Sequence, residues 1–180
     1  MRKVVAYALV SVDGVAQDPE EFLFDFDSVM EANLAEVIGT QDAVLLGRTL
    51  YDEWSTYWPE SDDQPFADFI NNVPKYVATS TPLSSKWSNA EPIEGPVTDF
   101  VRELKAGDGG DIGIHGSISL TQSMLAASLV DEVRLLVAPR VVGSGRRLFE
   151  HDVALSLQLI QSTGSPSGSL LVHYRVTTGD

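Results

Sequence analysis

The chain has 180 residues, no cysteine and a formal net charge of −14 at pH 7; its length predicts one domain, 1–180, that buries about two-thirds of the unfolded chain's surface. The negative charge repels nucleic-acid phosphates and anionic lipids, so we expect neither a nucleic acid nor a membrane as partner. The lack of cysteine excludes disulfides, thiolate catalysis and cysteine-based zinc sites, and it points to the cytoplasm.

The first ten residues carry two cations and a short apolar run, which superficially resembles a secretory signal peptide. Asp13 and Gly14 follow at once, no small-residue cleavage site is present, and the apolar run is too short to span a bilayer. Residues 4–10 therefore predict a first β-strand, and we expect a cytoplasmic protein.

Strand and helix patterns then alternate along the chain. A helix is predicted over 28–38, with Asp27 or Ser28 as its N-cap and Gly39 as its end. The pattern predicts further strands at 43–47, 75–79, 112–114 and just before Pro139, and a short strand within 87–93. It predicts further helices from Arg48 onward, at 66–70, at 97–104 and after Gly116. The last two strands, 156–160 and 170–176, are joined across 164–168 and predict an antiparallel hairpin.

This alternation predicts an α/β fold with parallel strands linked by helices and an antiparallel edge at the C-terminus. Ligands of such sheets bind at the carboxyl ends of the strands. Four of these ends carry small, polar or cationic residues: 11–14, 47–49, 79–81 and 115–117. We expect the functional site along this edge of the sheet.

The connection after residues 112–114 is a candidate anion site. Gly116 interrupts the strand, and Ser117 or Ser119 is placed to cap the helix that follows. The first N–H groups of a helix and its positive dipole end favour an anion, and a nucleotide phosphate is the usual one. An ordinary strand–helix connection that binds nothing is the alternative.

The familiar nucleotide and hydrolase motifs are absent. The sequence has neither the Gly-x-x-x-x-Gly-Lys-Ser/Thr loop nor the Gly-x-Gly-x-x-Gly turn, and it has no Gly-x-Ser-x-Gly elbow. The three histidines are isolated from one another, so we expect no metal site. A nucleotide site in this protein would be of another type.

Several charged residues are candidates for function. Arg48 begins a helix, where a cation opposes the dipole, and this favours a functional role. For Arg146 and Arg147 we favour pairing with the acidic surface over anion binding. A carboxylate near the loop after the first strand could protonate or orient a substrate, or could be a solvated or helix-capping group; the candidates are Asp13, Asp25, Asp27 and Glu31.

Six segments, in their order along the chain, resemble the dihydrofolate-reductase-like proteins related to the reductase domain of bifunctional riboflavin biosynthesis enzymes. They are 11–14, 46–48, 74–77 with 80–81, 116–120, 129–132 and 143–149. The resemblance implies a three-layer α/β/α fold with a mostly parallel central sheet and an antiparallel C-terminal hairpin. It also implies a homodimeric, NADPH-dependent reductase, similar to 5-amino-6-(5-phosphoribosylamino)uracil reductase, acting on a small heterocyclic or carbonyl-bearing substrate that resembles a pterin, a folate or a riboflavin precursor.

The resemblance further implies where NADPH binds. The adenosine and its 2′-phosphate would be flanked by Gly47, Arg48, Thr49, Thr79, Ser80 and Thr81. The pyrophosphate would be cradled by main-chain N–H groups of Gly116, Ser117, Ile118, Ser119 and Leu120. The loop 11–16 would face the nicotinamide and the substrate, and the predicted catalytic carboxylates are Asp13 and Asp27.

Two other interpretations stay open. The protein could be a non-catalytic dimer that binds a nucleotide or another small molecule on the same fold, or a scaffold without any nucleotide. The first would be favoured if Asp27 merely caps its helix instead of pointing into a pocket. The second would be favoured if the side chain of Leu50 or Ile118 blocked the phosphate path.

Overall fold

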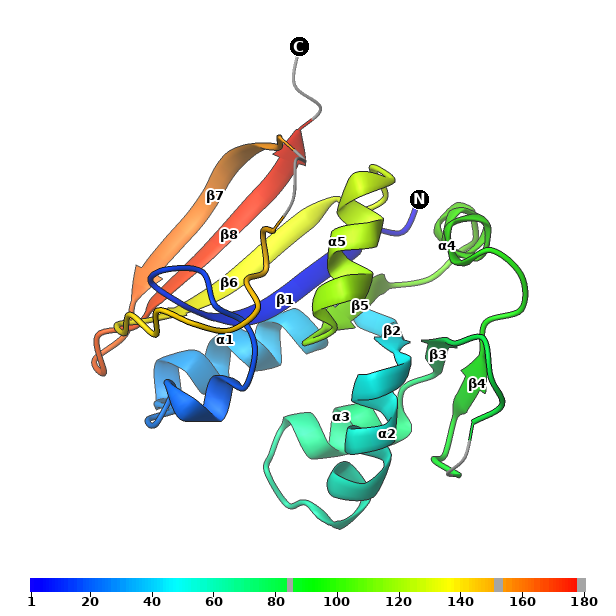
Figure 1. The fold of residues 1–180 in the computed structure, drawn as a ribbon, viewed down its shortest axis with the longest axis horizontal. Coiled ribbons are helices and arrows are strands. Elements are labelled where there is room, and N and C mark those ends of the chain that lie inside the picture. The colour runs from blue at the N-terminus through cyan, green and yellow to red at the C-terminus, as the bar shows by residue number, and fades with distance from the viewer. Residues whose placement is uncertain (84–85, 151–153, 178–180) are drawn as a thin grey trace.

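The computed structural model describes residues 1–83, 86–150 and 154–177, whose strands form one twisted sheet (Figure 1). The order of the eight strands in these ranges is β4-β3-β2-β5-β1-β6-β8-β7. Their bounds are β1 Val4–Ser11, β2 Gln41–Gly47, β3 Lys75–Ala78, β4 Ala90–Pro92, β5 Asp111–His115, β6 Glu132–Ala138, β7 Ser156–Gly164 and β8 Leu170–Thr177. Only β8 runs against its neighbours, β6 and β7, so the parallel sheet with an antiparallel C-terminal hairpin is confirmed.

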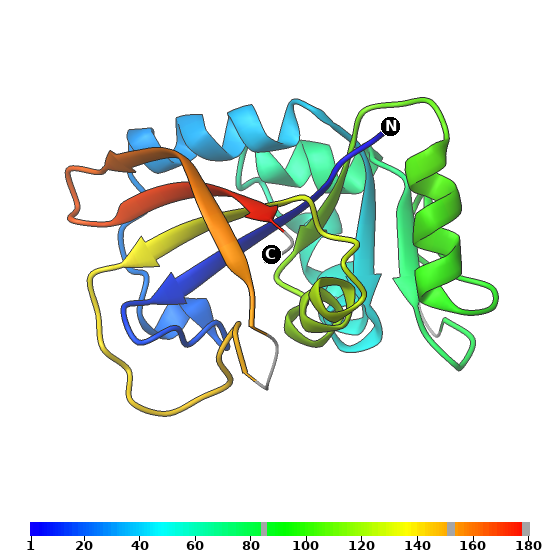
Figure 2. The same cartoon turned by 90° about the horizontal axis from the view of Figure 1, so that it is seen from above.

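Helices cover both faces of the sheet and make three layers (Figure 2). Their bounds are α1 Ser28–Ile38, α2 Arg48–Tyr57, α3 Phe66–Asn72, α4 Val97–Ala106 and α5 Ile118–Ala126. One core packs α4 and α5 against the sheet through Val101 and Met124. A second core packs α1, α2 and α3 on the opposite face, through Val37, Tyr51 and Ile70. No helix in the described ranges is both long and apolar enough to cross a membrane.

The position of β1 explains its composition. It lies between β5 and β6 near the middle of the sheet, and it pairs in parallel with both. Because helices cover both of its faces, side chains that point either way enter a core, and the strand is apolar almost throughout. The apolar run that resembles a signal peptide is therefore the central strand.

The short strand predicted within 87–93 is confirmed as β4, which spans Ala90–Pro92. Trp87 enters the core and lies over the ammonium group of Lys75, whose Nζ is 4.6 Å from the ring centroid. That Nζ also donates hydrogen bonds to the carbonyls of Ile70 and Val73, at 2.8 and 2.9 Å. Burial lowers the pKa of Lys75 to about 8. The sequence identified Lys75 as a strand residue, but not as the buried cation that satisfies the end of α3.

The end of β5 is fixed by a buried polar contact across the sheet. His115 Nε2 lies 2.8 Å from Gln41 Oε1 on the neighbouring β2, and burial lowers the pKa of His115 to about 3. Gly113 makes this contact possible, because a Cβ at that position would lie 2.7 Å from Gln41 Cδ and 2.8 Å from His115 Nε2. A glycine is therefore needed two residues before the end of β5.

We expect Gly113→Ala to lower the free energy of unfolding by about 1–3 kcal/mol, because the new methyl group must displace the buried Gln41 side chain from His115. Gly164→Ala is the matched control, since nothing lies within 4 Å of a Cβ there. Urea unfolding of both variants measures the difference. Equal stabilities of the two would contradict this account of Gly113.

Candidate functional site

Two strand-to-helix connections lie side by side at the carboxyl edge of the sheet. β2 leads into α2 at Gly47, and β5 leads into α5 through Gly116 and Ser117. The two connections are joined directly, because the Gly47 N–H donates a hydrogen bond of 3.0 Å to Ser117 Oγ. Ser117 is buried, so this bond is shielded from water.

This bond corrects the predicted role of Ser117. Ser117 occupies the N-cap position of α5, but its side chain caps no amide of that helix. Ser119, the other candidate cap, lies inside the helix. Among the described residues, the N–H groups of Ile118, Ser119 and Leu120 donate to no acceptor, because the first amides of a helix have no intrahelical partner and no side chain caps them. The start of α5 thus presents a row of open donors.

The turn before α5 brings these donors to the surface. Gly116 has φ 65°, a left-handed conformation that glycine adopts without strain. Gly116 and Ser119 are exposed, whereas Leu120 is buried in the core and anchors the helix. Leu50 lies beside the turn, with its Cδ2 3.4 Å from where a Cβ of Gly116 would be, but it leaves Gly116 exposed. An anion can therefore approach the open end of the helix dipole.

Arg48 organises the neighbouring part of the edge. Its Nε donates to both oxygens of Asp52, at 3.0 and 2.8 Å, and its Nη1 donates to the hydroxyls of Thr79 and Thr81, at 3.2 and 2.7 Å. Nη1 also donates to the carbonyls of Thr81 and Pro82. The cation at this helix start therefore has a structural reason, which is to hold the segment after β3 against α2.

The predicted cofactor residues are thus brought to three adjacent strand ends, of β3, β2 and β5. Gly47 contacts Ser117, and Arg48 contacts Thr79 and Thr81. Thr49 and Ser80 are exposed beside them.

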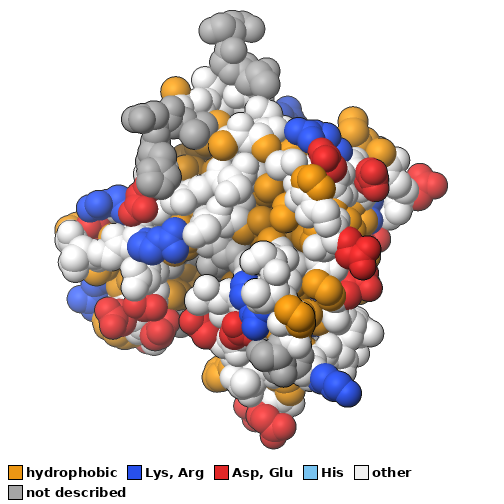
Figure 3. Space-filling view, turned by 45° about the vertical axis from the view of Figure 1, so that its right-hand side comes forward, with side chains coloured by type: hydrophobic (Ala, Val, Ile, Leu, Met, Phe, Trp, Pro, Cys, Tyr) orange, Lys and Arg blue, Asp and Glu red, His pale blue; other side chains and the backbone are white. Residues whose placement is uncertain are grey.

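Figure 3 shows one face of the molecule, on which hydrophobic side chains gather near the middle and charged side chains of both signs surround them.

Arg146 lies at this site, although the sequence favoured a different role for it. We expected Arg146 and Arg147 to pair with acidic groups, and Arg147 does so: its guanidinium lies 3.9 Å from the Asp13 carboxylate. Arg146 instead donates from Nη2 to Ser119 Oγ, at 2.9 Å, on the first turn of α5. The two residues lie 27 positions apart in the chain, and no sequence pattern links them.

Asp13 joins two loops. Its carboxylate accepts hydrogen bonds from Ser11 Oγ at 2.7 Å, and from the N–H groups of Val142 and Gly143 at 3.0 and 2.8 Å. The Ser11 hydroxyl and these two amides hold the pKa of Asp13 well below its ordinary value. Asp13 therefore ties the loop after β1 to the loop after β6, and it is ionised at neutral pH.

Asp27 caps α1, as the sequence predicts, and has a second task. Its Oδ1 accepts from the N–H groups of Val29 and Met30, at 3.0 and 3.2 Å. Its Oδ2 accepts from Ser165 Oγ at 2.7 Å and from Ser167 N at 3.1 Å, in the turn between β7 and β8. The Ser165 hydroxyl above all lowers the pKa of Asp27 to about 2. The catalytic roles of Asp13 and Asp27 remain predictions.

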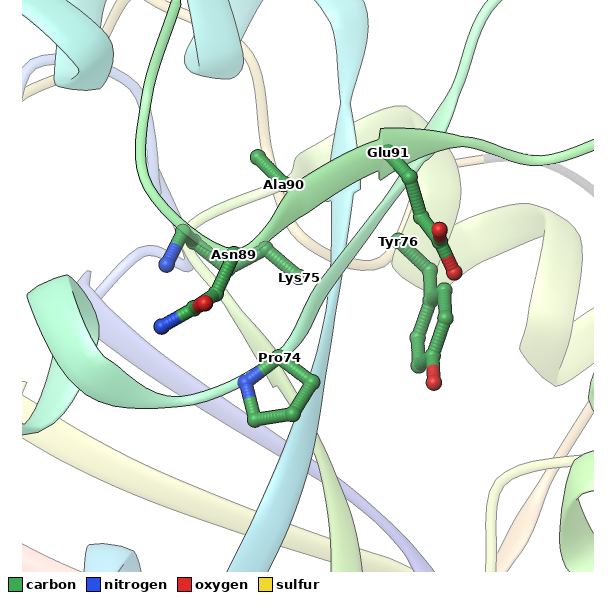
Figure 4. A pocket seen from close by; sticks show the side chains of 6 residues that line it. All are labelled: Pro74, Lys75, Tyr76, Asn89, Ala90 and Glu91. Atoms are coloured by element: carbon green, nitrogen blue, oxygen red, sulfur yellow. The ribbon is translucent and has the colours of Figure 1, made fainter.

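A hollow of about 280 Å³ lies at the other end of β3, away from these residues (Figure 4). It is lined by residues that begin β3 and β4: Pro74, Lys75, Tyr76, Asn89, Ala90 and Glu91. None of the predicted site residues lines it. We therefore do not assign the functional site to this hollow, since ligands of such sheets bind at the carboxyl ends of the strands.

The sequence matches the family of the RibD C-terminal domain over residues 2–171. The chain belongs to this family. It is 27% identical over 168 residues to the uncharacterized protein YyaP of Bacillus subtilis (strain 168). The matched region covers 91% of this chain and 83% of that protein. The expected relationship to riboflavin reductase domains is thereby confirmed.

Solved structures show the same fold. A Shewanella sp. PV-4 protein named for riboflavin biosynthesis is similar with a TM-score of 0.76 and 18% identity, over 98% of this chain and 99% of that chain. A dihydrofolate reductase from Enterococcus faecalis, complexed with NADP(H), is similar with a TM-score of 0.64 and 12% identity, over 98% and 97% of the two chains. The dihydrofolate-reductase-like fold is confirmed.

We expect Asp27→Asn to lower the melting temperature at pH 7, because a neutral amide accepts the Ser165 and Ser167 hydrogen bonds less strongly. The ordinary pKa of the group is 3.8, so between about pH 4 and pH 2 the unfolded chain binds more protons than the folded protein. Acidification through this range should therefore destabilise the native protein more than the variant.

Urea midpoints at pH 7 and pH 3 measure this difference. The exposed Asp25→Asn, two residues away, is the control. The assignment of Asp27 would be wrong if both variants lost the same stability on acidification as the native protein.

Proposed function

We propose that the protein is an NADPH-dependent reductase of a small heterocyclic or carbonyl-bearing substrate, similar to a pterin or a riboflavin precursor. The observation that carries this proposal is the open start of α5, where the amides of Ile118, Ser119 and Leu120 have no acceptor among the described residues and the Ser117 hydroxyl is bonded to Gly47 instead of capping them. Membership of the RibD C-terminal domain family, and a fold shared with a dihydrofolate reductase that binds NADP(H), support it.

The residues present fit such a cofactor. Residues 118–120 offer main-chain donors at a helix start, which suits a pyrophosphate, whereas the N–H groups of Gly116 and Ser117 already donate to the carbonyls of Tyr7 and His115. One strand further along, Arg48, whose Nε is paired with Asp52, holds the hydroxyls of Thr79 and Thr81, and these groups suit the adenosine side and its 2′-phosphate. Bound NADPH supplies a hydride, while the chain orients the two reactants and excludes water. Because this cofactor is a cytoplasmic metabolite, the same proposal places the protein in the cytoplasm.

One observation favours a second candidate, a nucleotide- or small-molecule-binding protein without catalysis. Asp13 and Asp27 are both engaged in hydrogen bonds that hold loops together, and these bonds keep both carboxylates ionised. An ionised carboxylate at neutral pH is a poor proton donor. A reductase on this scaffold would take its proton from water.

Titration with NADPH and NADH tests the cofactor. A nucleotide that binds only the folded protein stabilises it by about 2.7 kcal/mol at a hundredfold excess over its dissociation constant. We expect NADPH to raise the melting temperature of the native protein. Ser119→Asp should lower the affinity for NADPH by about tenfold or more, because the new carboxylate repels the pyrophosphate. The same variant should not destabilise the free protein, since a helix start favours negative charge.

Ser123→Asp is the matched control, because it adds the same charge one turn further along α5 at an exposed position. It should leave NADPH binding nearly unchanged. No stabilisation of the native protein by either nucleotide at millimolar concentration would refute the cofactor proposal. Equal binding to both variants would place the nucleotide elsewhere.

We also propose that the protein is a homodimer joined through β7. This strand forms one edge of the sheet, and all nine of its residues are exposed, including Leu157 and Leu159. It carries no charged side chain, although the chain has a net charge of −14. A long uncharged edge strand is unusual on a monomer, and two copies of an acidic chain can approach there without opposing carboxylates.

We expect a molar mass of twice 19.5 kDa for the native protein by light scattering, and a single chain for Leu159→Glu, because the new carboxylates would face each other across the interface. Val141→Glu is the control, since it places the same charge at an apolar residue that is 74% exposed in the loop after β6; this variant should stay dimeric. A monomeric native protein, or a dimeric Leu159→Glu, would contradict the proposed interface.

A further inference from the structure

The backbone around Arg146 is held firmly between two parts of the molecule. The carbonyl of Arg146 accepts from the N–H groups of Ala16 and Gln17, at 2.9 and 3.3 Å, and its own N–H donates to Gln17 Oε1 at 3.1 Å. On the other side, Gln122 of α5 donates from Nε2 to the carbonyl of Arg147, at 3.1 Å. The loop after β6 is therefore docked on both the loop after β1 and α5.

The close approach of the two loops depends on Gly145. Its φ of 112° suits glycine alone, and a Cβ there would lie 2.9 Å from Val15 Cγ1. Leu148, which is 2% exposed, anchors the loop in the core a few residues later. The main chain thus sets the direction from which the Arg146 side chain leaves.

The side chain ends at an electrostatically unfavourable place. Its guanidinium donates to Ser119 on the first turn of α5, where a cation opposes the helix dipole. Five other arginines have a carboxylate within 4.0 Å; they are Arg2, Arg48, Arg102, Arg134 and Arg147. Among the described residues, Arg146 has none, which is also true of Arg140 and Arg175, but of these three only Arg146 contacts the start of a helix. An anion between the guanidinium and the amides would satisfy both.

We propose that Arg146 binds the diphosphate bridge of the dinucleotide, together with the amides of Ile118, Ser119 and Leu120. This inference rests on the proposed function and adds to it a cation from the loop after β6. Charge-assisted hydrogen bonds from a guanidinium to phosphate are stronger than those from neutral donors, and α5 offers only neutral donors. Because the same residue holds Ala16 and Gln17, the diphosphate contact also lies directly against the loop that leads from β1 to α1.

Three ligands separate this contact from the rest of the site. NADPH contains all parts of the cofactor, ADP contains the diphosphate without the nicotinamide, and 2′-AMP contains the adenosine and 2′-phosphate without the diphosphate. We expect Arg146→Ala to lower the affinities for NADPH and ADP by about tenfold and to leave the affinity for 2′-AMP unchanged. The affinity of this variant for NADPH should also depend less on salt concentration. Arg146→Lys should recover part of the affinity, since it restores the charge without the planar fork.

Calorimetric titration measures the affinities, and the melting temperature without ligand shows that the variant is folded. Arg102→Ala, on α4 and paired with Asp99, removes the same charge elsewhere and should bind all three ligands as the native protein does. Native affinity of Arg146→Ala for both NADPH and ADP would overturn the inference while leaving the proposed function intact. If the native protein binds neither ligand, the proposed function fails, and this inference fails with it.

Discussion

The hydrogen bond from the Gly47 N–H to Ser117 Oγ is the constraint on which the site depends. It joins the connections after β2 and β5, which are neighbours in the sheet, and it fixes α2 relative to α5. A serine at the start of a helix usually caps the helix itself. Here the hydroxyl is used across the sheet, and the helix keeps donors that are available to a ligand. One side chain thus both stabilises the edge and leaves it open.

The acidic composition shapes the rest of the molecule. Carboxylates hold loops through hydrogen bonds from backbone amides and hydroxyls, as Asp13 does for the loop after β6 and Asp27 does for the β7–β8 turn. Such bonds favour the ionised form and lower the pKa of both groups. Acidic residues beside the expected substrate loop therefore stabilise the protein. Arg48 and Arg146 are the cations at the carboxyl edge of the sheet in a chain with a net charge of −14.

The loop after β6 links the two halves of the site. Asp13 and Arg147 fasten it to the loop after β1, while Gln122 fastens it to α5. Its glycines permit close approach, and its arginines point in different directions, one toward a carboxylate and one toward the start of a helix. A segment that reads as a basic, glycine-rich loop is thus a fitted connection between the expected cofactor and substrate regions.

The order of strands and helices, the α/β class, the hairpin and the family could all be predicted from the sequence, because apolar periodicity, glycine stops and short motifs are local properties. The sequence also placed the polar strand ends at one edge. The tertiary structure alone decided the partners of the polar side chains: Ser117 with Gly47 across 70 positions, and Asp27 with Ser165 across 138. A hydroxyl or carboxylate has several possible partners of similar strength, and only packing brings one of them within bonding distance.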